Sequence, residues 1–66
     1  MRVKFSTPDA VVEVECEPGT TVRGAIQMTP IHPSTVLAVH DGAVIPQNTI
    51  IHEDVEIELI IVSSGG

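Results

Sequence analysis

Residues 55–62, Val-Glu-Ile-Glu-Leu-Ile-Ile-Val, form the longest strand that the sequence predicts. Apolar residues alternate with glutamates at its start, which is typical of a strand with one buried face. The residues predicted to face the core are Val55, Ile57, Leu59 and Ile61. Ile60 and Val62 are then predicted to point outward. Four small residues follow directly, namely Ser63, Ser64, Gly65 and Gly66. We therefore predict a folded domain over residues 1–62 and a flexible tail over residues 63–66.

Two shorter alternating segments lie at the start of the chain. Residues 2–6 place Val3 and Phe5 on one face and Arg2 and Lys4 on the other. Residues 12–17 alternate in the same way, with two valines and Cys16 opposite three glutamates. A turn signal at residues 7–9, Thr-Pro-Asp, separates them. The two segments are predicted to form a hairpin.

A short helix is predicted after the Pro-Gly break at residues 18–19. Thr20 or Thr21 is a suitable N-cap for this helix. Val22, Ala25 and Ile26 follow with the spacing of one apolar helix stripe. Glycine in the helix, and a Thr-Pro pair at residues 29–30, limit it to about two turns. Such a helix depends on docking onto a sheet for its stability.

The remaining segments predict an α+β domain of two layers. Residues 36–40 and 43–45 are short apolar strands, and Asp41-Gly42 between them is a hairpin signal. Together the strands make a mixed four- to five-stranded sheet with one short helix packed on one face. A right-handed helical crossover places the last strand parallel to the first. Arg2 and Lys4 then lie between two glutamate-bearing strands and form favourable cross-strand pairs.

Composition narrows the functional classes. The chain has 66 residues, with 3 basic residues against 9 acidic ones and a net charge of −6. This argues against a nucleic-acid partner, which requires clustered Lys and Arg. The negative charge suits a basic protein surface, although it can equally serve solubility alone. No apolar segment approaches the ~20 residues that span a bilayer, and residues 1–6 lack a signal-peptide pattern. We expect no membrane partner and a cytoplasmic location.

The Gly65-Gly66 pair suggests chemistry at the chain end. A glycine carboxylate is an anion at neutral pH and a poor electrophile, so it reacts only after activation, most simply by adenylation with ATP. Glycine leaves the activated carbonyl accessible because it has no Cβ. The alternative interpretation is that Ser-Ser-Gly-Gly is a frayed end without a role.

Taken in order, two opening strands, a helix after Pro-Gly-Thr, the hairpin at residues 36–46 and the Gly-Gly end resemble the ubiquitin-like β-grasp proteins. The similarity covers the whole chain. It is greatest to the prokaryotic group, which includes the thiamine-pathway sulfur carrier, the small subunit of molybdopterin synthase and archaeal small modifiers. The neutral residues before Gly65 also fit this group better than eukaryotic ubiquitin, which has basic residues there.

The resemblance implies a carrier or modifier protein and not an enzyme. An E1-like enzyme would use ATP to adenylate Gly66. The adenylate would become a thiocarboxylate for a sulfur-acceptor enzyme, or an amide with a lysine of a target protein. The chain itself would bind no cofactor and would be a monomer when free. The alternative is a β-grasp protein-interaction module whose tail is never activated.

Several other residues are candidates for a site. Ile60 and Val62, with Ala38 or Val36 from the third strand, are predicted to form an apolar patch that binds the activating enzyme, although isolated exposed aliphatic residues are also ordinary. Lys4 is the only lysine, and it is either a possible self-acceptor or a member of a charge pair. The spacing of His32, His40 and His52 matches no metal motif, so we expect no metal site. Cys16 is predicted to be a buried, inert thiol.

Overall fold

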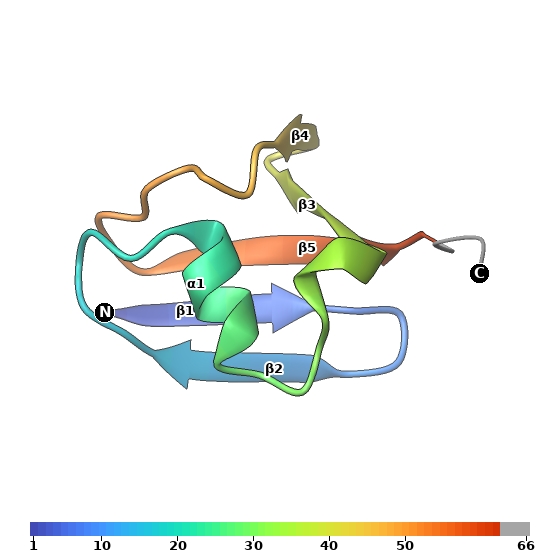
Figure 1. The fold of residues 1–66 in the computed structure, drawn as a ribbon, viewed down its shortest axis with the longest axis horizontal. Helices are drawn as coiled ribbons and strands as arrows, with labels where there is room; N and C mark the ends of the chain where they lie inside the picture. The colour runs from blue at the N-terminus through green and yellow to red at the C-terminus, as the bar shows by residue number, and fades with distance from the viewer. Residues whose placement is uncertain (63–66) are drawn as a thin grey trace.

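The computed structural model describes residues 1–62, which form one mixed five-stranded sheet with a helix lying across one face (Figure 1). The elements are β1 (Arg2–Ser6), β2 (Val11–Glu15), α1 (Val22–Gln27), the 3₁₀ helix η1 (Pro33–Thr35), β3 (Val36–His40), β4 (Ala43–Ile45) and β5 (Val55–Ile61). The strand order is β2-β1-β5-β3-β4. β1 pairs antiparallel with β2 and parallel with β5, as predicted.

The short helix α1 is fixed by its cap and by its apolar side. The hydroxyl of Thr21 accepts a hydrogen bond of 3.0 Å from the backbone N–H of Gly24. Its residues Val22, Ala25 and Ile26 face the sheet and are completely buried. A helix of six residues is too short to be stable alone, so this burial against the sheet holds it in place.

The core lies between α1 and the middle strands of the sheet. Val3 and Phe5 of β1 and Ile57 and Leu59 of β5 are among its most buried side chains. Within residues 1–62 no polar or charged side chain is buried. Burial of apolar surface therefore provides most of the driving force for this fold.

A two-residue turn joins β3 to β4. Asp41 and Gly42 have φ angles of 56° and 81°, both in the left-handed region. This is the requirement of a type I′ hairpin, for which Asp-Gly is a favoured pair. The predicted hairpin is confirmed.

Four details differ from the sequence prediction. β2 covers Val11–Glu15 and not residues 12–17, because its pairing with β1 ends at the pair Arg2 and Glu15. Beyond this pair, Met1 and Cys16 are joined by backbone hydrogen bonds but belong to neither strand. Cys16 is half-buried and not fully buried, since it lies beside the edge strand and packs only at the margin of the core. Ile61 is 57% exposed despite its inward phase, because it lies past Leu59, the last core residue of β5. The expected loop before β3 contains η1.

Candidate functional site

The carboxyl end of β5 is where the described part of the chain leaves the sheet. The backbone N–H of Val62 donates a hydrogen bond of 2.8 Å to the carbonyl oxygen of Thr35, at the end of η1. Val62 is half-buried in this position. This bond holds the backbone of Val62 against the end of η1. The predicted site residues Gly66, Gly65, Ser64 and Ser63 lie outside the described residues.

An apolar surface lies beside this point, on the sheet face opposite α1. Leu37 and Ile60 are direct partners across β3 and β5 and are 42% and 41% exposed. Val39 and Val44 form the next outward pair, across β3 and β4; Val44 is 63% exposed, whereas Val39 is buried at 9%. We call the three exposed residues of these pairs, Leu37, Val44 and Ile60, the outer apolar surface. The predicted outward position of Ile60 is confirmed.

The prediction that Ala38 belongs to this surface is wrong. Ala38 is 1% exposed and pairs with the core residue Leu59, so it faces α1, and Val36 is buried on the same side. Four consecutive apolar residues in β3 show no alternation, so the sequence alone did not fix which of them point outward. Leu37 takes the place predicted for Ala38. The register with Ile60 identifies Leu37, because paired residues of neighbouring strands lie on the same face.

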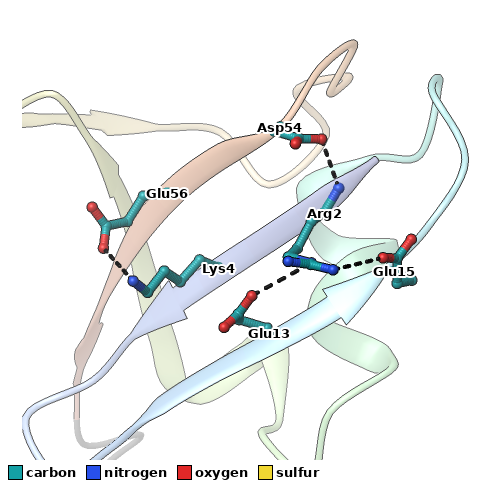
Figure 2. A network of polar contacts seen from close by, with 6 residues as sticks. All are labelled: Arg2, Lys4, Glu13, Glu15, Asp54 and Glu56. Carbon is teal, nitrogen blue, oxygen red and sulfur yellow. Dashed lines mark hydrogen bonds and ion pairs between the residues drawn. The ribbon is translucent and has the colours of Figure 1, made fainter.

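A charged area covers the other half of the same face (Figure 2). The Arg2 guanidinium lies 3.5 Å from a carboxylate oxygen of Glu13 and 3.4 Å from one of Glu15. The Lys4 Nζ lies 3.8 Å from a carboxylate oxygen of Glu56. All these side chains are exposed, so each pair contributes at most about 1 kcal/mol. The predicted basic strand between two acidic strands is confirmed, and Lys4 is a member of a charge pair, while its role as an acceptor stays a prediction.

The helix side of the same end carries a second apolar area. A hollow of about 380 Å³ lies between the β1–β2 turn, the segment before η1 and the end of β5. Its apolar lining includes Ala10, Val12, Pro30, Ile31, Val36 and Ile61. Ile61 and Ile60 therefore present exposed aliphatic side chains on opposite faces of the sheet, immediately before Val62.

The other candidates do not assemble into a site in the described part of the chain. His32, His40 and His52 are all exposed, and residues 1–62 contain no group of three His, Cys, Asp or Glu side chains placed to hold a metal ion. Within the same range, no helix combines the length and the apolar character needed to cross a membrane.

Comparison with known proteins supports the fold. No family model matches the chain, and no curated protein matches it. Among solved structures it is similar to one described as Caldiarchaeum subterraneum ubiquitin, with a TM-score of 0.74 and 19% sequence identity. The match covers 100% of this chain and 98% of that chain. The chain therefore has the ubiquitin-like β-grasp fold, and that prediction is confirmed.

Proposed function

We propose that this chain is a ubiquitin-like sulfur carrier, a protein modifier, or both, and that it acts through the carboxylate of Gly66. An E1-like enzyme joins this carboxylate to the α-phosphate of ATP and releases pyrophosphate. A sulfide then displaces AMP to leave a thiocarboxylate, or the amine of a target lysine displaces AMP to leave an amide. The chain is the substrate in both outcomes, and the activating enzyme uses the ATP.

The observation that carries this proposal is the position of Val62 in a ubiquitin-like fold. Val62 is bonded to Thr35 at the margin of the sheet, between exposed aliphatic residues of both faces. Gly66 is only four residues further along the chain, so it lies within about 14 Å of Val62 even when those residues are fully extended. An enzyme that activates Gly66 must therefore contact the surface around Val62. Leu37 and Ile60 offer it apolar contacts there.

The last four residues suit passage into such an enzyme. Gly65 and Gly66 have no side chains, so a narrow channel admits them and the carbonyl stays accessible. Ser63 and Ser64 add length with little bulk. Lys4 is the one lysine side chain through which copies of this protein could be joined to each other. The other partners in the proposal are a sulfur-acceptor enzyme or the lysines of target proteins.

The test of the proposed chemistry is the mass of the protein isolated from its own cells. Replacement of one carboxylate oxygen by sulfur adds about 16 Da, and conjugation leaves Gly-Gly remnants on lysines of other proteins. We expect at least one of these products in wild-type cells, and neither after removal of Gly65 and Gly66 or of the activating enzyme. A wild-type protein that ends at Gly66 and yields neither product would instead be an interaction module. A measured mass that does not correspond to a chain ending at Gly66 would contradict the proposed site.

A second experiment tests the docking surface. ATP–pyrophosphate exchange by the purified activating enzyme is measured with the wild-type chain and with Ile60→Asp, which places a charge beside Val62. We expect a KM for the chain at least about fivefold higher, since disruption of a central interface contact commonly costs more than about 1 kcal/mol. Val11→Asp is the matched control, because Val11 is equally apolar and 55% exposed but lies on β2, at the opposite edge of the sheet from β4. Equal effects of the two variants would remove Ile60 from the interface.

A further inference from the structure

The short helix α1 leaves part of the helix side of the sheet open. α1 has only six residues, and the chain between β4 and β5 runs alongside it without a helix or strand of its own (Figure 1). A hollow of about 180 Å³ lies between them, and we call it the loop hollow. The side chains that line it include those of Val22, Ile51 and Ile57, all of which are buried. The loop hollow therefore reaches down to the core.

Backbone hydrogen bonds fix the walls of the loop hollow. The N–H of Val22 donates a bond of 2.9 Å to the carbonyl oxygen of Thr49, and the N–H of Ile51 donates one of 2.9 Å to that of Thr20. Ile51 faces the core and is 6% exposed, so its neighbour Ile50 faces outward and is 51% exposed. The loop hollow is thus formed before a partner arrives, with an exposed aliphatic side chain in its lining. Such a site avoids part of the ordering cost of binding.

The rim of the loop hollow is polar and has no lysine or arginine. His40, His52 and Glu53 belong to its lining, and all three are exposed. With histidine counted as neutral, Glu53 is the only charged residue of the lining, and within residues 1–62 it forms no ion pair. The net charge of −6 adds to the negative potential there. The rim therefore favours a cation.

We infer that the loop hollow binds a partner protein that inserts one apolar side chain of about the size of phenylalanine and carries a lysine or arginine beside it. An apolar protein cavity of about 150 Å³ binds benzene, so a hollow of about 180 Å³ has room for one phenyl ring. Contacts with Ile50 and the buried lining supply affinity, and Glu53 selects the cation. The only phenylalanine of this chain, Phe5, is completely buried, so a second copy cannot supply the ring.

The loop hollow lies at the opposite end of β5 from Val62. Val55 and Ile57, at the start of this strand, line it, and the seven residues of β5 span about 20 Å. A partner held there need not cover the surface around Val62. The inference does not depend on activation of Gly66.

The test uses the full ¹⁵N-labelled chain and three short capped peptides as probes. The first peptide has one phenylalanine between two lysines, the second replaces both lysines by glutamate, and the third replaces the phenylalanine by alanine. We expect the first peptide, at millimolar concentration, to shift the backbone amide signals of Ile50, Ile51 and His52. The second should bind at least about twofold more weakly, as for the loss of one exposed ion pair. The third should leave the signals in place, since no ring enters the hollow.

Matched variants separate the loop hollow from the rest of the surface. Ile50→Thr is expected to weaken the first peptide at least about twofold, whereas Val11→Thr, at a similarly exposed position on β2, should leave it unchanged. Glu53→Gln should weaken it about two- to fivefold. Glu58→Gln changes the net charge equally but lies on the other face of the sheet, since Glu58 alternates with the core residues of β5, and it should have no effect.

Several results would overturn the inference. They are an absence of shifts at millimolar concentration of the first peptide, shifts that map to other residues, equal binding of the lysine and glutamate peptides, equal binding of the phenylalanine and alanine peptides, and equal effects within either pair of matched variants. Shifts at Ile50 and His52 that grow with protein concentration alone would also overturn it, because the occupant would then be a second copy of this chain.

Discussion

Two identical substitutions in β5 test the assignment of its two faces. Ile57 is 1% exposed and packs in the core beneath α1, whereas Ile60 is 41% exposed on the opposite face. Ile57→Thr and Ile60→Thr remove the same atoms and introduce the same hydroxyl. Threonine is β-branched like isoleucine, so the preference for strand geometry is retained in both variants. A difference in stability between them therefore reports burial.

The expected difference follows from the two environments. At Ile57 the change removes buried carbon atoms, as an Ile→Val change does at a cost of 0.5–1.5 kcal/mol, and adds a hydroxyl in an apolar core, so the total cost is about 2 to 4 kcal/mol. At Ile60 the side chain is already partly in water, and we expect a cost below about 1 kcal/mol. A domain of this size has a free energy of unfolding of roughly 3 to 10 kcal/mol. Ile57→Thr therefore removes a large part of the total, and Ile60→Thr removes little.

Urea unfolding followed by far-UV circular dichroism measures both costs. The chain contains no Trp or Tyr, so fluorescence is not a suitable probe. With an m-value of about 1 kcal/mol/M, we expect the unfolding midpoint to fall by about 2 to 4 M for Ile57→Thr and by less than about 1 M for Ile60→Thr. Equal shifts in the two variants, or a larger shift for Ile60→Thr, would refute the assignment of faces. The expected result would also qualify Ile60→Thr as a folded variant for binding experiments.

Three further changes test local features of the fold. Gly42→Ala is expected to lower the free energy of unfolding by about 1 to 2 kcal/mol in the same urea assay, because φ is +81° there, whereas Gly42→Asn should cost less since asparagine tolerates this region. Thr21→Ala removes the N-cap bond to Gly24 and should cost about 1 kcal/mol, which lowers the melting temperature by about 4 to 8 °C; an unchanged melting temperature would contradict the role of the cap. The half-buried thiol of Cys16 should react with iodoacetamide in the native protein, more slowly than in urea, and complete protection would contradict its position at the margin of the core.

The fold could be predicted from the sequence because its local signals agree. Strict alternation in residues 2–6 and 55–59 identified the inward residues of β1 and β5, and Asp41-Gly42 identified the hairpin. The mixed pairing of β1 with β2 and β5 followed from the order of the elements and from the charges of Arg2 and Lys4. Each of these signals lies within one segment or between two neighbouring strands.

The composition of the outer apolar surface could not be predicted with the same accuracy. β3 reads Val-Leu-Ala-Val-His, so its phase depends on its register with β5 and not on its own residues. A shift of one residue moves every side chain of a strand to the other face, which is why Ala38 was expected where Leu37 lies. The sequence also does not show where the core ends along β5. Ile61 continues the alternation of β5 but is exposed, because it lies past Leu59, the last core residue of the strand. Such limits are set by the tertiary arrangement and not by residue type.

The distribution of charge on the outer face follows from the small number of cations. Only three basic residues are present, and the two on β1 are both paired, Arg2 with β2 and Lys4 with β5. These two cations offset two of the three negative charges of Glu13, Glu15 and Glu56. Within residues 1–62, the half of the face that adjoins Val62 keeps Glu58 without an ion pair beside exposed aliphatic residues. Unmatched charge and exposed apolar area therefore lie together at the end of the sheet from which the chain continues to Gly66.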